Sequence, residues 1–357
     1  MNAIPLIVGF GRAGRDLHLH CLRRLVRTGT LTIDVSTVHA VDKLAADPSH
    51  RLADGVMLHG SLADAANVVP SSAVVHICTG PDTHFQVLAE AARLGFRRFI
   101  IEKPMASTAA DATRIADLVA RCGLDVVVVA NWLSSALTAH LMERIATDPD
   151  SRPLGSIVMR QTKSRLSRAS GEGHSSAFDV EMPHLVALAL HLAGQDAELV
   201  ASSCADVRVG DRIHRDLGQA FMELSHVGGL RCQLYTDLAC PTRERSIEFR
   251  TATGMVRGYF PADGSDSFSY LFQLDERGAV MARQLIADDP LSTCLLQSYR
   301  YFQGGAPRPA SDVAFNQKAV ALLDAAKAVC RTRRAAGADE AERRAKSEIR
   351  INELAEV

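Results

Sequence analysis

The sequence lacks the features that mark several large classes of protein. Its 40 Lys and Arg against 41 Asp and Glu leave a formal net charge of -1, which argues against nucleic acid or an anionic membrane as a partner. No apolar run approaches the roughly 20 residues needed to span a bilayer. No basic segment leads into an apolar stretch near Met1, so we expect no secretory signal. These absences predict a cytoplasmic protein.

Paired cysteines are also missing. The eight cysteines are scattered along the chain without a Cys-x-x-Cys pair. In a chain of this length such spacing indicates buried thiols in a reducing compartment, not a disulfide framework or a zinc site. We therefore expect no bound metal.

Apolar residues, in contrast, are plentiful, at 47% of 357 residues, which is enough for two domains. Short apolar runs alternate with helical patterns over residues 1–130 as a β-α-β series of six strands. This alternation predicts an α/β Rossmann domain with a doubly wound parallel sheet.

The pattern changes after residue 130. Residues 131–310 hold strand-like segments separated by turn signals, and one helix interrupts them. They predict an α+β domain with a largely antiparallel, open-faced sheet. We expect a helix over residues 311–334 to pack back on the first domain, and residues 335–357 to form a charged tail.

A glycine-rich turn follows the first apolar run, residues 3–8. Gly9-Phe10-Gly11-Arg12-Ala13-Gly14 lies between this strand and a helical pattern, which is the context of a dinucleotide fingerprint. Its glycines allow the backbone to approach a pyrophosphate at the helix N-terminus. A second apolar run ends at Asp42, which favours NAD because a carboxylate repels the 2′-phosphate of NADP. Lys43 weakens that preference, so NADP stays open.

Another apolar strand, residues 99–101, ends in Glu102-Lys103-Pro104. Pro104 stops the strand, and ligands of an open α/β sheet bind at the carboxyl ends of its strands. From this strand alone, the two charges are either an ion pair or the chemistry of the site.

Together with Thr79-Gly80-Pro81-Asp82-Thr83-His84, these motifs resemble the glucose–fructose oxidoreductase/inositol dehydrogenase (Gfo/Idh/MocA) family of NAD(P)-dependent oxidoreductases. The resemblance extends to about Arg334. It implies that Lys103 is catalytic, beside the substrate oxygen, and that Glu102 binds the nicotinamide ribose. We expect His18 and His84 to be structural or cofactor-side residues. The implied cofactor-binding residues are Gly9, Gly11, Arg12, Ala13, Gly14, Asp42, Lys43, Thr79, Pro81, His84 and Glu102.

The resemblance also implies a catalytic histidine in the second domain, for which the sequence offers His184. Pro183 suits a first helical turn, where the helix dipole favours a neutral, proton-accepting imidazole. The family has an aspartate four residues earlier, but Val180 stands there. Asp179 or Glu181 takes over its role, or the role is absent. The expected substrate residues are Lys103, Asn131, Lys163, Asp179, Glu181 and His184, with a loop over residues 164–176 near the cleft.

The resemblance implies an enzyme that transfers a hydride between nicotinamide and a secondary alcohol or ketone of a sugar, cyclitol or aminocyclitol. Its partners would be a small polyol or sugar and its own copies, in a homodimer or homotetramer. Lysine is scarce, which is typical of GC-rich genomes in which such enzymes often serve antibiotic biosynthesis. Two alternatives stay open: an NAD-dependent glycosidase or epimerase using transient oxidation, and a non-catalytic dinucleotide-sensing regulator, which would be expected to lose Lys103 and His184.

Overall fold

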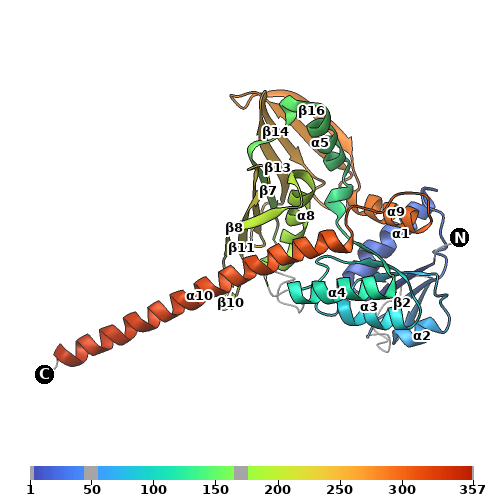
Figure 1. Ribbon diagram of the computed structural model, residues 1–357, viewed down its shortest axis with the longest axis horizontal. Helices are drawn as coiled ribbons and strands as arrows, with labels where there is room; N and C mark the ends of the chain where they lie inside the picture. Colours follow the sequence, from blue (N-terminus) through green and yellow to red (C-terminus); the bar gives the residue numbers. More distant parts are fainter. Residues whose placement is uncertain (1–3, 44–54, 165–175, 356–357) are drawn as a thin grey trace.

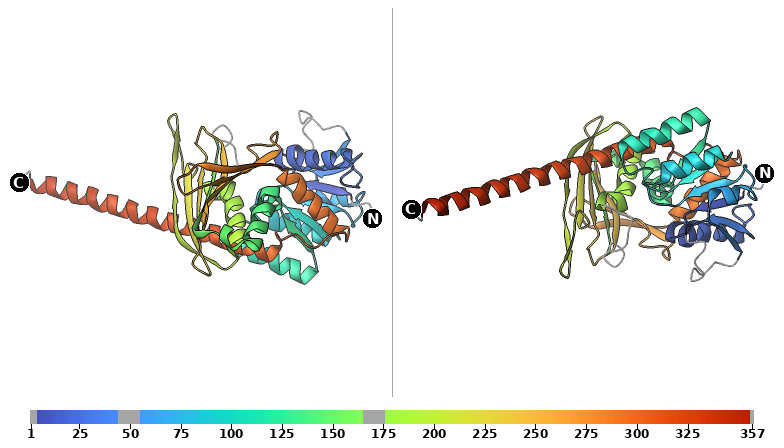
Figure 2. Two further views of the ribbon diagram at one scale, coloured as in Figure 1. Left: turned by 90° about the horizontal axis from the view of Figure 1, so that it is seen from above. Right: turned by 90° about the horizontal axis from the view of Figure 1, so that it is seen from below.

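The computed structural model describes residues 4–43, 55–164 and 176–355, with side chains as far as residue 336 (Figure 1). Two β-sheets, each with its own apolar core, lie side by side. The long C-terminal helix α10 crosses both and then runs out beyond the second sheet, as all the views show (Figures 1 and 2).

The first sheet has the strand order β3-β2-β1-β4-β5-β6, and every neighbouring pair is parallel. This is the doubly wound order of a dinucleotide-binding fold, so the predicted fold class is confirmed. The inner strands are buried on both faces, which explains their uninterrupted apolar sequences. The strands are β1 Pro5–Val8, β2 Val38–Val41, β3 Val56–His59, β4 Val74–Ile77, β5 Arg98–Ile101 and β6 Asp125–Val128.

Helices cover the two faces of this sheet. Capping residues set the limits of α4: the Thr108 hydroxyl accepts from the backbone N–H of Asp111, and Gly123 ends the helix at φ 58°. Helix α3 begins at His84, directly after the turn that follows β4. The helices are η1 Arg12–Leu19 continuing into α1 His20–Arg27, α2 Leu62–Ala66, α3 His84–Arg93 and α4 Ala109–Cys122.

Helix α9, Pro290–Phe302, lies beside α1 on the same sheet (Figure 1). Its Leu295 and Tyr299 share a core with Val74 and Ile100 of the first sheet. This helix lies within residues 131–310 and is not among the elements that were predicted there. The segment thus follows the second sheet in the chain but packs on the first one.

The second sheet has the order β16-β15-β14-β13-β7-β12-β11-β8. Only the β7–β12 pair is parallel, so the largely antiparallel sheet is confirmed. Strands β11 and β12 alternate buried and partly exposed residues, as a sheet with one face against a core does. The strands are β7 Leu154–Thr162, β8 Ala197–Cys204, β11 Gln219–His226, β12 Arg231–Asp237, β13 Glu244–Thr251, β14 Gly254–Tyr259, β15 Phe268–Leu274 and β16 Val280–Ala287, with the separate pair β9 Val207–Val209 and β10 Arg212–His214.

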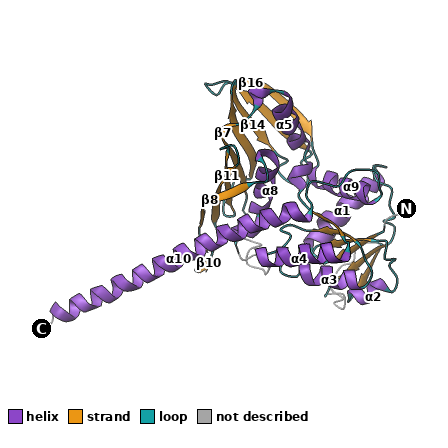
Figure 3. Ribbon diagram, viewed as in Figure 1, coloured by secondary structure: helices purple, strands orange, loops and turns teal. Residues whose placement is uncertain are grey.

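The remaining helices lie around the second sheet and at its junction with the first (Figure 3). None of the described helices is long and apolar enough to cross a membrane. Their bounds are η2 Asn131–Ser134, α5 Ala136–Thr147, η3 Pro149–Ser151, α7 Ala177–Val180, α8 Met182–Ala193 and α10 Val313–Ala355.

Helix α10 joins the two cores. Phe315 and Leu323 pack in the core of the second sheet, whereas Val313 and Val320 pack in that of the first. The helix continues to Ala355, so the segment expected as a charged tail is helical as far as that residue. Residues on two faces of one helix therefore hold the sheets at a defined spacing.

Candidate functional site

The glycine turn after β1 has room on one side only. Gly9 has φ 87°, and a Cβ there would lie 2.9 Å from the Cys78 backbone. A Cβ on Gly14 would lie 2.2 Å from the Gly9 carbonyl oxygen, whereas a Cβ on Gly11 would meet no described atom within 4 Å. Tight packing beneath and open space above, at the N-terminus of η1, fit a dinucleotide pyrophosphate.

Asp42 lies beside this turn, at the end of β2. Its Oδ2 accepts a 2.7 Å hydrogen bond from the backbone N–H of Phe10. Lys43 and Arg12 are exposed nearby in the chain, and Asp42 is partly buried. The carboxylate is thus held at the position where we expect the adenosine ribose.

The turn after β4 is tied to the turn after β5 by His84. Its Nδ1 lies 3.0 Å from the Met105 carbonyl oxygen, and its Nε2 lies 3.0 Å from that of Thr79. Burial lowers the pKa of this imidazole, while its contacts with the two carbonyl oxygens raise it. His84 therefore joins two loops, while Thr79 and Pro81 remain partly exposed beside it.

Glu102 follows β5 with its carboxylate held by two donors. Oε1 lies 2.8 Å from Nε2 of His18, and Oε2 accepts from the backbone N–H of Lys103 at 3.1 Å. Burial raises the pKa of Glu102, but the hydrogen bond and charge of His18 outweigh it and the net shift is downward. The carboxylate is therefore ionised, and its side chain is 12% exposed.

Lys103 and His184 approach each other from different domains. They line one cavity between the sheets, together with Trp132 and Asn316. His184 lies in the first turn of α8, as predicted. Its ring packs edge-on against the ring of Trp132, with 6.0 Å between the two ring centroids. The Lys103–Pro104 peptide bond is cis. The sequence placed these residues far apart, and the fold brings them to the same cavity.

The position of the missing aspartate is occupied by a main-chain carbonyl. Nζ of Lys103 donates a 2.7 Å hydrogen bond to the carbonyl oxygen of Val180. A carbonyl oxygen orients an ammonium as a carboxylate does, but it carries no full charge. The lysine is thus held across the domain boundary without an acidic side chain at position 180.

The two acids that flank Val180 are engaged elsewhere. Glu181 is buried and forms an ion pair with Lys163, and it also accepts from Gln161. Asp179 is buried and accepts from Nζ of Lys327 at 3.0 Å. Neither acid lines the cavity that holds Lys103 and His184, so their roles toward a substrate stay predictions.

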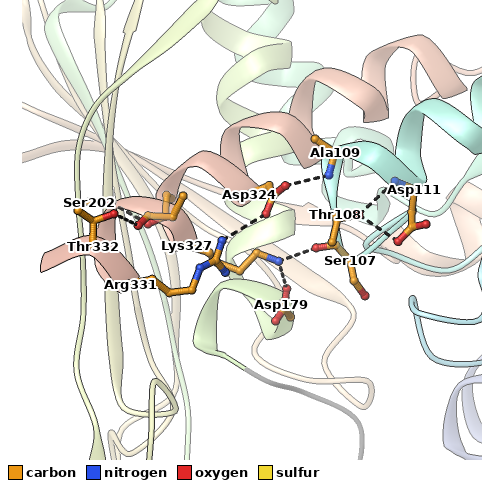
Figure 4. A network of polar contacts seen from close by, with 12 residues as sticks. Ser107, Thr108, Ala109, Asp111, Asp179, Ser202, Asp324, Lys327, Arg331 and Thr332 are labelled. Atoms are coloured by element: carbon orange, nitrogen blue, oxygen red, sulfur yellow. Dashed lines mark hydrogen bonds and ion pairs between the residues drawn. The ribbon is translucent and has the colours of Figure 1, made fainter. Parts of the chain in front are cut away.

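Lys327 links three parts of the chain (Figure 4). Besides Asp179 of α7, its ammonium contacts the carbonyl oxygen of Ser107 at 2.7 Å, before α4. One turn earlier on α10, Asp324 accepts from the backbone N–H of Ala109 at 3.0 Å. These contacts fasten α10 to both domains beside the cavity.

Two groups near the cavity complete the picture. The side-chain oxygen of Asn131, an expected substrate residue, is buried and has no hydrogen-bond partner among the described residues. Asn316 was not foreseen, because no motif marks it and only the return of α10 brings it to the cavity.

No group of three or more potential metal ligands occurs within the described ranges. Most of the expected 164–176 loop lies outside the described residues.

Comparisons with known proteins agree with this geometry. The model of the family described as "Oxidoreductase family, NAD-binding Rossmann fold" (GFO_IDH_MocA) matches residues 5–130. No curated protein sequence matches the chain. Among solved structures, the chain is similar to a 3-ketoreductase from Actinomadura kijaniata crystallised with NADP and TDP-benzene, at TM-score 0.71 and 15% identity, over 92% of this chain and 98% of that one.

Two further structures share the fold over nearly their whole length. An NAD binding oxidoreductase from Klebsiella pneumoniae aligns at TM-score 0.72 and 14% identity, over 93% of this chain and 97% of that one. A UDP-N-acetylglucosamine 3-dehydrogenase from Acidithiobacillus ferrooxidans aligns at TM-score 0.69 and 15% identity, over 92% and 98%. At these identities the likeness shows the two-domain fold.

Proposed function

We propose that the protein is an NAD(P)-dependent dehydrogenase or ketoreductase, because residues 5–130 match the model of the oxidoreductase family with an NAD-binding Rossmann fold. Its substrate is a secondary alcohol or ketone of a sugar, cyclitol or aminocyclitol. The observation that carries the proposal is the meeting of Lys103 and His184 at one cavity between the domains.

The first domain holds the cofactor through contiguous motifs. The open space over Gly11 receives the pyrophosphate at the start of η1, and Asp42 lies at the adenosine ribose. The carboxylate of Glu102 accepts a hydrogen bond from a hydroxyl group of the nicotinamide ribose. Bound NAD(P) supplies the group that accepts or donates the hydride. Asp42 favours NAD, since its carboxylate would repel a 2′-phosphate.

Lys103 and His184 manage the proton and the charge of the substrate oxygen. One N–H of the Lys103 ammonium is donated to the Val180 carbonyl, which holds the ammonium at the cavity. Its positive charge stabilises negative charge on the oxygen as it develops. In the oxidative direction the His184 imidazole accepts the hydroxyl proton, and in the reductive direction it returns that proton.

The names of similar proteins support the choice of a sugar. One is a UDP-N-acetylglucosamine 3-dehydrogenase, and another is a 3-ketoreductase crystallised with NADP and TDP-benzene. The lining of the cavity combines a few polar groups, Lys103, His184 and Asn316, with apolar side chains. The Lys163–Glu181 pair on the second-domain side supports the sheet from which substrate contacts would come.

We also propose that the protein assembles as a homodimer or homotetramer through the second sheet. Its edge strand β16 exposes Val280, Met281 and Leu285, and the neighbouring β15 exposes Phe268. Clustered apolar side chains on a sheet are typical of a surface that is covered in an assembly. Light scattering of the purified protein tests this, and a monomer at high protein concentration would contradict it.

The test of the activity is a spectroscopic screen. Purified protein is mixed with NAD or NADP and a panel of polyols, cyclitols and nucleotide-linked sugars, and reduced nicotinamide is followed by its absorbance. Turnover with a secondary alcohol supports the proposal. Incorporation of solvent deuterium without a net change of cofactor would favour the epimerase or glycosidase alternative. Calorimetric binding of cofactor without turnover of any substrate would favour a regulator.

A further inference from the structure

A chain of buried hydrogen bonds runs from Glu102 into the core beneath the first sheet. Nε2 of His18 lies 2.8 Å from Oε1 of Glu102, Nδ1 of His18 lies 2.8 Å from Nδ1 of His76, and Nε2 of His76 lies 2.8 Å from the Tyr299 hydroxyl. The two histidines and the tyrosine are 0% exposed. The four residues come from the end of β5, η1, β4 and α9, so the chain exists only in the assembled fold.

The geometry leaves two proton arrangements. Because two Nδ1 atoms face each other, one must carry the proton and the other must accept it. If His18 is an imidazolium, it donates to both Glu102 and His76, and His76 then donates from Nε2 to the Tyr299 oxygen. If His18 is neutral, every bond beyond Glu102 reverses, and the Tyr299 hydroxyl donates to His76. The two arrangements differ by one proton, and in both of them Nε2 of His76 is bonded to the Tyr299 hydroxyl, which accepts in the charged arrangement and donates in the neutral one.

We propose that Tyr299, acting through His76 and His18, is a positioning residue for Glu102, and that it keeps the carboxylate oriented and ionised toward the cofactor ribose. This inference rests on the proposed function. Tyr299 lies on a helix that follows the second sheet in the chain, so the second half of the sequence helps to build the cofactor site of the first half.

The surrounding groups favour the charged arrangement. Burial lowers the pKa of His18, but its contacts with Cys78 and Glu102 raise it, and the net shift is well upward. Burial and the charge of His18 lower the pKa of His76, while burial raises that of the Tyr299 phenol. The carboxylate of Glu102 is thus the charge that favours a proton on His18, while the shifts of His76 and Tyr299 favour their neutral forms. The other titratable groups around the His18–Glu102 pair are Cys21, Cys78, His84, Lys103 and Cys294.

The substitution Tyr299→Phe tests this role, because it keeps the aromatic ring and removes only the hydroxyl. In both arrangements the variant removes the bond to Nε2 of His76 and leaves a buried ring nitrogen without a partner, which costs free energy. The proton equilibrium between the two arrangements therefore changes, and we expect the pKa of His18 to shift by about one unit.

The measurement is a pH titration of the histidine ring nitrogens by nuclear magnetic resonance in ¹⁵N-histidine-labelled, cofactor-free protein. The titration is paired with calorimetric affinities for NAD and NADP at several pH values. We expect the His18 titration to shift by about one pH unit in Tyr299→Phe, and cofactor affinity at pH 8 to fall about three- to tenfold. Tyr301→Phe is the matched control: this hydroxyl on the same helix bonds Asp125 at 2.6 Å, and its loss should leave both readouts unchanged.

If Tyr299→Phe does not fold, His76→Asn serves instead, because an asparagine amide keeps a group near Nδ1 but loses the contact with Tyr299. The same shift is expected. A His18 titration and cofactor affinity equal to wild type in either folded variant would overturn the proposal. The titration needs no substrate, so the two proposals can fail separately. A protein that turns over sugars but shows no titration shift would support the proposed function and contradict the role of Tyr299. A protein that shows the shift but turns over no sugar would support the role of Tyr299 and contradict the proposed function.

Discussion

The two sides of the cleft are built in different ways. On the cofactor side, the groups come from three contiguous motifs, each at the carboxyl end of a parallel strand. On the substrate side, the two acids that the sequence offered, Asp179 and Glu181, are buried in ion pairs with Lys327 and Lys163. Local chain geometry determines the first side, whereas contacts between distant segments determine the second.

The difference teaches where an acid near a catalytic histidine finds its partner. A buried carboxylate needs a compensating charge or donors, and whichever cation the fold brings closest supplies it. At position 179 that cation comes from α10, and the ammonium of Lys103 donates to a main-chain carbonyl. An acid beside a histidine in the sequence is thus weak evidence for a catalytic pair.

The largest expected effect comes from Lys103→Ala, which removes the proposed charge stabilisation at the substrate oxygen. We expect kcat to fall by about 10²- to 10⁴-fold with cofactor affinity nearly unchanged. Steady-state kinetics and calorimetry measure the two quantities. Lys43→Ala, an exposed lysine next to the ribose-side acid, is the control for kcat. A Lys103→Ala enzyme with more than a tenth of wild-type kcat would mean that the cavity residue is not catalytic.

The interdomain contact is the next test of the comparison. Lys327→Met leaves the buried Asp179 without its cation, and we expect the free energy of unfolding to fall by about 3 kcal/mol. Lys318→Met on the same helix is the matched control: its ion pair with Asp196 is exposed, so it should change stability by at most about 1 kcal/mol. Urea denaturation compares them. Equal losses in both variants would show that the Lys327 contact has no special weight.

The glycine turn allows a finer distinction. In Gly14→Ala the new Cβ would collide with the Gly9 carbonyl, so we expect a loss of about 1–3 kcal/mol in stability without cofactor. Gly11→Ala meets open space and should change stability by less than about 0.5 kcal/mol, yet weaken cofactor binding because the space is then filled. Thermal unfolding and calorimetry separate the effects. Normal cofactor affinity in Gly11→Ala would contradict the proposal that the pyrophosphate binds at this turn.

The smallest effect concerns pH. The pKa of His18 is raised in the folded protein, so its stabilisation is complete below the unfolded pKa of about 6.5 and is lost as pH rises through the folded value. In the wild-type protein, we expect His18 to make the free energy of unfolding decline by about 1 kcal/mol above pH 7, and we expect His18→Asn to lack this part of the decline. Urea denaturation at several pH values measures this, with the exposed His20→Asn as control. A decline of the same slope in His18→Asn would contradict the assignment.

Of the elements that were not predicted from the sequence, helix α9 has a recognisable sequence pattern. Helix α9 begins with Asp289 as its N-cap, accepting from the backbone N–H of Ser292, and Pro290 follows at the first helical position. That capping pattern predicts a helix start. Strand β16 has no such pattern, because almost all its residues are exposed and its apolar residues do not alternate.

The sequence by itself determined the doubly wound sheet, the glycine turn and the placement of Glu102 and Lys103 at a strand end. Each of these depends on backbone geometry within a few residues and on the rule that parallel strands open their crevice at the carboxyl edge. Only the tertiary structure decided which charges meet. The pairing of Lys103 with the Val180 carbonyl, of Asp179 with Lys327 and of His76 with Tyr299 joins segments far apart in the chain, and no local pattern in the sequence encodes such contacts.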